Sequence, residues 1–238
     1  MEGKKIIINQ AFGLGDLLWI EPICRWYHEQ GYKVILPVDD HYYWLMYYIR
    51  YIHYKEKSGF KMDYEQCHMD YKHEEIPVVP LRFSTPILRG CEPHDGELKE
   101  HFMLDKYRLL DLPLDMWRTL QWTRNMEKEQ ELYDFLELKK PYTLVNLNFG
   151  GGLQRIDVKI EGVQMRPINK FTLLDWSKVI EEAEVIHTVE TSVIYMIETL
   201  DIKAKEIHMY PRTPYEKTLK GVKNFISDKW ILHPVKEL

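Results

Sequence analysis

A glycine-containing turn near the start of the chain places a carboxylate where α/β proteins often carry their sites. Gly13-Leu14-Gly15-Asp16 follows the apolar run Ile6-Ile7-Ile8, which is typical of a buried parallel strand. Asp16 then falls in the first turn of a helix, where backbone N–H groups favour a carboxylate. At the carboxyl end of a parallel strand it can act as general base on a hydroxyl. A structural turn with a capping aspartate is the alternative.

A second polar turn, Glu190-Thr191-Ser192, separates the predicted strand 185–189 from a helical pattern over 193–200. Free N–H groups and hydroxyls at the start of a helix suit a phosphate. The Glu190 carboxylate would repel such an anion, so it suits a ribose hydroxyl or backbone amides instead. A plain helix cap is the alternative, because Ser and Thr are common caps.

Other residues of the second half suit the same kind of ligand. Arg155, Arg166 and Arg212 are the only arginines after residue 140, and loop arginines can clamp a diphosphate. The glycines 150–152 allow close approach of the backbone to a ligand. His187 and His208 lie in predicted strands, where a histidine satisfied by the backbone is the ordinary interpretation.

Several kinds of site have no motif in the chain. HxH, HExxH and DxD patterns are absent, so no metal site is expected, and neither GxSxG nor a Walker A loop occurs. Three cysteines without a CxxC pair argue against a zinc knuckle or a disulfide framework and fit a reducing compartment.

The composition and net charge of the chain further limit the class of protein and its partners. The 238 residues are 45% hydrophobic and 29% charged, as in a globular protein, and the net charge is −5. No segment is a basic block, which disfavours a nucleic-acid partner, although a modified-DNA acceptor stays open. No apolar run of about 18 residues predicts a membrane span, and the N-terminal run is too short for a signal peptide. We therefore expect a cytoplasmic protein.

The periodicity predicts two α/β lobes joined by a helical connector. A strand at 6–8, a helix over 17–29 and a strand at 33–38 form a right-handed crossover in a parallel sheet. Helices are expected over 41–54 and through most of 98–138, with Asp115 as a cap. The second lobe restarts with strands at 142–149, 163–167, 185–189 and 206–210, and a helix over 173–183 begins at Thr172 or Asp175. The expected boundaries are 1–97, 98–140 and 141–238.

Taken together, these motifs resemble the heptosyltransferase-like glycosyltransferases. The opening strand, Gly13-Leu14-Gly15-Asp16 and Pro22 look like the start of that family, and 174–192 looks like its C-terminal signature. The arrangement is similar to short glycosyltransferase-like proteins of viruses and environmental bacteria, which would place the chain in a host cytoplasm if it is viral. The resemblance implies a GT-B architecture, in which two Rossmann-like lobes with parallel sheets face a cleft.

The resemblance also implies a function: inverting, metal-independent transfer of a sugar from a nucleotide-sugar donor to the hydroxyl of a glycan or other acceptor. Asp16 would be the catalytic base, and no cofactor is implied beyond the nucleotide-sugar co-substrate. Seven aromatic residues crowd 42–54, and among them Tyr43, Trp44 and Tyr47 are expected to contact the acceptor. The expected donor-binding residues are Gly13, Gly15, Gly150, Gly151, Arg155, His187, Glu190, Thr191, Ser192 and Arg212.

Two other functions stay open. One is a catalytically degenerate module of the same fold that binds a nucleotide-sugar. The other is a different Rossmann-like enzyme such as an epimerase, which would need the dinucleotide fingerprint that residues 13–18 lack.

Overall fold

The computed structural model divides the chain into two compact units, which we call unit 1 (Met1–Thr123) and unit 2 (Arg124–Leu238). The predicted connector 98–140 is divided between them. Among the described residues, no helix is long and apolar enough to cross a membrane. The structure describes residues 4–10, 13–56, 61–62, 69–70, 76–81, 102–150, 154–212, 222–223 and 226–233.

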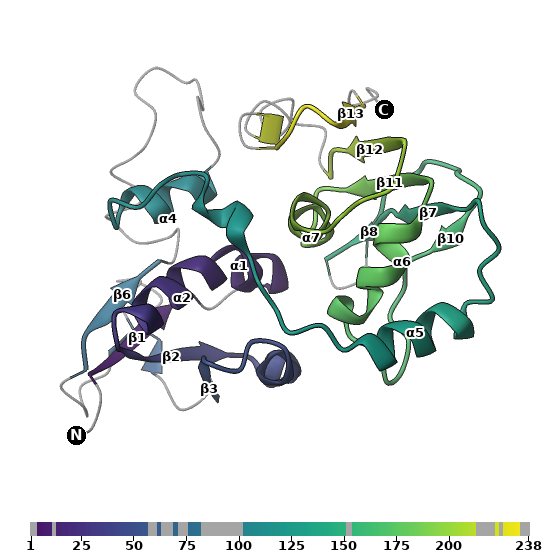
Figure 1. Cartoon of the computed structure of the whole chain (residues 1–238). Helices are drawn as coiled ribbons and strands as arrows, with labels where there is room; N and C mark the ends of the chain where they lie inside the picture. The colour runs from purple at the N-terminus through teal and green to yellow at the C-terminus, as the bar shows by residue number, and fades with distance from the viewer. Residues whose placement is uncertain are drawn as a thin grey trace, which may run out of the picture. The chain divides into compact units, whose positions relative to one another are not determined.

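Unit 1 is built on a parallel sheet of four strands, in the order β3-β2-β1-β6 (Figure 1). The strands are β1 (Lys5–Asn9), β2 (Lys33–Val38), β3 (His53–Glu56) and β6 (Val78–Pro80). Each pairs in parallel with its neighbours, as the crossover pattern predicts. A separate antiparallel pair joins β4 (Lys61–Met62) to β5 (Met69–Asp70).

The helix predicted over 17–29 is two helices, α1 (Leu14–Trp19) and α2 (Glu21–Glu29). Pro22 lies in the first turn of α2, where its missing N–H removes no helical hydrogen bond. Gly31 follows with a φ of +82°, the left-handed conformation expected after a helix end.

The single helix predicted over 41–54 is wrong. The segment forms a 3₁₀ helix, η1 (Asp40–Tyr47), and then turns into β3. Leu45, Tyr48, Ile49 and Ile52 supply the buried side of the segment. Tyrosine and tryptophan are weak helix formers that fit strands well, so the aromatic spacing here reflects packing beneath a short helix and a strand edge.

The helical pattern predicted over 98–138 is also interrupted. It contains η3 (Phe102–Leu104), α4 (Asp105–Arg108), η4 (Met116–Thr119) and α5 (Met126–Phe135), with non-helical chain over 120–125. Asp115 makes no side-chain cap hydrogen bond. Instead Asn125 caps α5 by accepting from the Lys128 N–H at 3.2 Å. The Thr123 N–H donates to the Tyr48 carbonyl at 2.7 Å, which holds the non-helical chain against unit 1.

Unit 2 carries a five-stranded parallel sheet in the order β10-β7-β11-β12-β13. Its strands are β7 (Thr143–Asn146), β10 (Val163–Gln164), β11 (Val185–Val189), β12 (Glu206–Tyr210) and β13 (Trp230–Leu232). A hairpin of β8 (Asn148–Phe149) and β9 (Gln154–Arg155) follows β7. The strands predicted at 185–189 and 206–210 are confirmed residue for residue.

The helices of unit 2 are α5, η5 (Leu173–Trp176), α6 (Ser177–Glu182) and α7 (Val193–Thr199). Thr172 and Asp175 both start η5: they form a reciprocal capping box, and the Asp175 carboxylate accepts from the Thr172 N–H at 2.7 Å.

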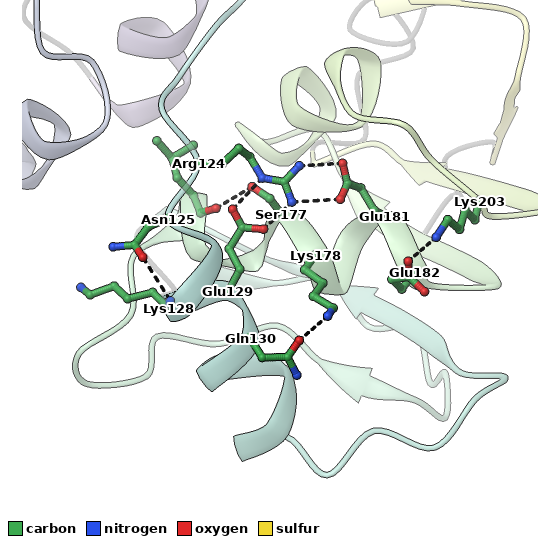
Figure 2. Close-up of polar contacts among 11 residues, drawn as sticks. Arg124, Asn125, Lys128, Glu129, Gln130, Ser177, Lys178, Glu181, Glu182 and Lys203 are labelled. Carbon is green, nitrogen blue, oxygen red and sulfur yellow. Dashed lines mark hydrogen bonds and ion pairs between the residues drawn. The ribbon is translucent and has the colours of Figure 1, made fainter.

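A buried ion network joins α5 to α6, as Figure 2 shows. The Arg124 guanidinium lies between the carboxylates of Glu129 and Glu181, donating to Glu129 Oε1 at 2.6 Å and to Glu181 Oε1 at 2.8 Å. Glu129 is 0% exposed, so its charge depends on this partner. The hydrogen bonds that Arg124 donates to Glu129 and to Glu181 raise the pKa of Arg124.

Gly162 is a close backbone approach in unit 2. Its φ is +152°, and a Cβ there would lie 2.5 Å from the Thr143 carbonyl oxygen of β7. Any larger residue would push the chain entering β10 away from its neighbour strand.

Gly162→Ala is therefore expected to destabilise the protein by about 2–3 kcal/mol. Gly150→Ala is the matched control, because Gly150 also has a positive φ of +59° but meets only the Gln154 side chain at 3.6 Å or more. It should cost only about 1 kcal/mol. Urea denaturation followed by circular dichroism measures both, and equal losses would contradict the close approach.

Candidate functional site

Asp16 lies just beyond the carboxyl end of β1, in the first turn of α1. Its side chain is 23% exposed, so solvent or a ligand can reach it. Gly13 is the N-cap of α1, with an ordinary φ of −58°, whereas Gly15 is inside the helix. The motif therefore begins a helix at the sheet edge where α/β proteins place their sites.

A buried lysine that sequence reasoning missed pairs with Asp16. Lys106, on α4, donates from Nζ to Asp16 Oδ1 at 3.1 Å and to Gln10 Oε1 at 2.7 Å. Its side chain is 0% exposed. Burial lowers the pKa of Lys106, and the ion pair with Asp16 opposes that shift. No short-range signal could have shown this pair, because 90 residues separate its members.

The end of β1 itself is polar and buried. Asn9 and Gln10 are 1% and 0% exposed. Among the described residues, the two amide atoms of Asn9 and Nε2 of Gln10, all of them buried, have no hydrogen-bond partner. Since such groups cost free energy when left unpaired, their presence beside Asp16 is characteristic of a site rather than of a core.

Aromatic packing holds α4 against α1. The Trp19 indole N–H donates to the Met103 carbonyl at 2.9 Å, and the Tyr107 hydroxyl donates to the Trp19 carbonyl at 2.5 Å. The Trp19 ring also stacks on Trp117, with centroids 4.7 Å apart. We call Trp19, Tyr107 and Trp117 the Trp19 cluster. It fixes the residues on either side of Lys106.

The aromatic residues proposed for acceptor binding have different exposures. Tyr47 is 68% exposed, whereas Tyr43 and Trp44 are partly buried, and Trp44 packs edge-on against Tyr48. Tyr42 lies nearest to the Asp16 turn: its hydroxyl would be 3.8 Å from a Cβ on Gly13. Burial raises the pKa of Tyr42, and the charges of Asp39 and Asp16 add to that shift.

Tyr51 has a structural role instead. Its hydroxyl bonds to the buried carboxylate of Glu21, which also accepts from the Gln121 N–H at 2.9 Å and from Arg25 Nε at 3.2 Å. Burial raises the pKa of Glu21. These bonds join α2 to the chain after η4.

In unit 2, polar residues gather at the carboxyl ends of β7 and β11. Asn146 ends β7 and is 7% exposed. Its Nδ2 donates to Thr188 Oγ1 at 2.8 Å and to Thr191 Oγ1 at 3.0 Å. The amide thus fixes the Thr191 hydroxyl, and Ser192 follows as the N-cap of α7. Asn146 was not among the expected site residues, although a polar residue ending an apolar strand could have indicated it.

Glu190 and Arg212 are brought together beyond β11 and β12. Arg212 Nη2 lies 3.9 Å from Glu190 Oε1, and the Glu190 N–H donates to the Tyr210 carbonyl at 3.3 Å. Arg212 is 42% exposed and Glu190 only 9%, so the guanidinium is the accessible member of the pair.

The hairpin residues form a separate group. Gly150 takes the positive φ its type permits, and Gly151 lies outside the described residues. Arg155 is exposed and bonds to Gln164 Oε1 at 3.2 Å. Arg166 is exposed as well.

His187 lies in the middle of β11, opposite His208 of β12. The two imidazoles stack with centroids 4.3 Å apart, His187 Nδ1 is 3.0 Å from the Tyr210 hydroxyl, and His208 Nδ1 is 2.9 Å from His233 Nε2. Burial lowers the pKa of His187 to about 4, with a further contribution from His208 and His233. Within the part of the chain that the structure describes, no group of His, Cys, Asp or Glu is arranged to hold a metal ion.

Comparison with known proteins identifies the fold. No protein-family model and no curated protein matches the chain. A crystal structure of the glycosyl transferase family 9 from Veillonella parvula DSM 2008 has a TM-score of 0.59 and 12% identity over 99% of this chain and 88% of that one. The dodecameric iron-containing heptosyltransferase TibC, in complex with ADP-D-β-D-heptose, has a TM-score of 0.54 and 7% identity. That alignment covers 97% of this chain, which spans 62% of the TibC chain. The chain thus has the predicted GT-B-like α/β fold.

The histidine stack predicts a pH effect on stability. Because the pKa of His187 is lowered to about 4 in the folded chain, the unfolded chain binds more protons between about pH 6.5 and 4. Stability should therefore fall as the pH falls through this window, by at most about 1.4 kcal/mol per pH unit for this group.

His187→Phe keeps an aromatic ring stacked on His208 but removes the titratable imidazole at position 187. Urea denaturation at several pH values should show a shallower loss of stability in this variant. His28→Phe in unit 1 is the control, with the wild-type pH dependence expected. An unchanged slope in His187→Phe would refute the assignment.

Proposed function

We propose that the chain is a glycosyltransferase that moves a sugar from a nucleotide-sugar to an acceptor hydroxyl. The observation that carries the proposal is a reachable carboxylate, Asp16, at the carboxyl edge of a parallel sheet in a fold like that of glycosyltransferases. Fold alone does not define an activity, so the proposal depends on what these residues can do.

The donor is proposed to bind at the carboxyl edge of the unit 2 sheet. The Thr191 hydroxyl, oriented by Asn146, and the exposed Arg212 guanidinium offer donors to a diphosphate. Glu190 is proposed to accept from a ribose hydroxyl, since its charge disfavours phosphate. The nucleotide-sugar bound in TibC, ADP-D-β-D-heptose, supports this class of donor. Gly150 and Arg155, from the hairpin that follows β7, and Ser192, the N-cap of α7, are further proposed donor contacts. His187 is proposed to contribute through its contact with the Tyr210 hydroxyl.

The proposed reaction is a single inverting displacement. The acceptor O–H bond breaks as its proton passes to Asp16, and the acceptor oxygen forms a bond to the anomeric carbon. The bond from that carbon to the diphosphate oxygen breaks, and its electron pair leaves with the nucleoside diphosphate. Arg212 and the hydroxyls at the strand ends stabilise that charge, in a mechanism we propose to need no metal.

The acceptor side is proposed to use η1. Tyr47 exposes a large aromatic surface that can stack on a sugar ring, and Tyr43 and Trp44 flank it. A glycan or another hydroxyl-bearing molecule is the acceptor class that such rings favour.

A catalytically degenerate nucleotide-sugar-binding module is the second candidate. The observation that favours it is the Lys106–Asp16 ion pair, because a paired carboxylate is a weaker proton acceptor. Both candidates are expected to bind the nucleotide-sugar donor, but only the glycosyltransferase is expected to turn it over.

The test begins with a thermal-shift panel of UDP-, GDP-, ADP- and CMP-sugars, followed by assays of transfer and donor hydrolysis. Asp16→Asn is expected to lower kcat/KM by about 100-fold or more while the donor-induced shift persists. Because this change leaves Lys106 without its ion pair, folding of the variant is checked by circular dichroism at the assay temperature. Asp115→Asn, at an exposed site without a cap bond, is the control and should leave turnover unchanged.

Near-normal turnover in Asp16→Asn would contradict the general-base role. Binding of a nucleotide-sugar by the wild-type chain without hydrolysis or transfer would favour the module. Failure of every nucleotide to bind would contradict both candidates.

A further inference from the structure

Lys106 is a charged group with no access to solvent. Its contacts among the described residues are Asp16 Oδ1 at 3.1 Å and Gln10 Oε1 at 2.7 Å. Gln10 is neutral, so Asp16 is the group that compensates the ammonium. Burying a lysine ammonium costs free energy, and a single carboxylate partner offsets only part of that cost. A buried lysine of this kind therefore suggests a role beyond packing.

The position of Lys106 does not depend on Asp16 alone. Met103 and Tyr107 on either side of it are bound to the indole and the carbonyl of Trp19. Trp19 ends α1, the helix that carries Asp16. The lysine and the carboxylate are therefore held on two elements joined by the Trp19 cluster, which is how a preorganised contact is built.

The pair engages one carboxylate oxygen. Oδ1 of Asp16 binds the ammonium, and within the described chain Oδ2 has no hydrogen-bond partner. Since the Asp16 side chain is 23% exposed, Oδ2 is the oxygen that an acceptor hydroxyl can approach. Among the described residues, the Tyr42 hydroxyl from η1 is another titratable group near Asp16.

We propose that Lys106 is a positioning residue for the base Asp16: its ammonium binds Oδ1, holds the carboxylate in place and leaves Oδ2 directed toward the acceptor hydroxyl. This inference rests on the proposed function. In the transfer step the acceptor proton goes to Oδ2, and it leaves to solvent after the nucleoside diphosphate departs. Lys106 neither gives nor takes a proton.

The first test is the pH dependence of kcat/KM in Lys106→Gln, which removes the charge and keeps a hydrogen-bond donor. The acidic limb should move to higher pH by about one to two units, because the variant lacks the positive charge beside Oδ1. Lys106→Arg keeps the charge and should retain the wild-type limb. Arg108→Gln is the surface control, since Arg108 is exposed and forms an ion pair with Asp105 on the same helix.

The second test needs no substrate. In protein labelled with ¹³C at aspartate carboxyls, the Asp16 signal is identified by its loss in Asp16→Asn. Its titration midpoint should be higher in Lys106→Gln than in the wild type by the same one to two units. If Lys106→Gln does not fold, Lys106→Met and Gln10→Leu replace it, the latter leaving the charge and removing the second hydrogen bond.

A structural role alone would lower activity at all pH values in proportion to the folded fraction. An unmoved acidic limb and an unmoved midpoint in folded Lys106→Gln would therefore overturn the proposal. If the midpoint moves but the wild-type chain transfers no sugar from any donor, the proposed function fails and the electrostatic effect on Asp16 stands. If transfer occurs and only the pH effects are missing, the positioning role fails and the function stands.

Discussion

The buried ammonium of Lys106 must be compensated by a negative charge, and this requirement constrains how unit 1 is built. Leaving such a charge without its partner costs about 3–5 kcal/mol, a large part of the stability of a typical domain. The compensation comes from Asp16, so the turn after β1 must lie where α4 can reach it. The Trp19 cluster brings α4 close to this turn, because it joins α1 to the chain around α4. The same constraint leaves a charged, partly exposed carboxylate at the sheet edge, and this is the group to which we assign the chemistry.

The sheet of unit 2 also has polar residues at the carboxyl ends of its strands, but different interactions organise them. Its polar strand ends are organised by a neutral amide, Asn146, which orients two threonine hydroxyls. Its ion network lies away from that edge, between α5 and α6, where Arg124 compensates the buried Glu129. The charge left at the strand ends is the accessible guanidinium of Arg212. Unit 1 thus has a partly exposed carboxylate and unit 2 an exposed guanidinium, to which we assign the base and the anion donor in the proposed transfer.

The sequence predicts the parts of this arrangement that depend on neighbouring residues. The strand patterns located β2, β11 and β12, and Thr172 and Asp175 marked the start of η5. The aromatic segment 41–54 was misassigned because three- and four-residue spacing of buried rings also fits a 3₁₀ helix followed by a strand. Asp16 could be proposed from the sequence because its motif is local. Lys106 was not, since its position depends on tertiary contacts across 90 residues. The approach of Gly162 to Thr143 depends in the same way on strand register. The short viral or environmental branch and the cytoplasmic location stay predictions.

The most direct test of the proposed donor site is a co-crystal structure with a nucleotide-sugar that the chain binds. We expect the diphosphate to lie at the carboxyl edge of the unit 2 sheet, with its oxygens within hydrogen-bond distance of Thr191 and Arg212. We expect a ribose hydroxyl to lie at Glu190. A nucleotide bound elsewhere, with these side chains free of it, would contradict the proposed donor site and the transfer mechanism built on it.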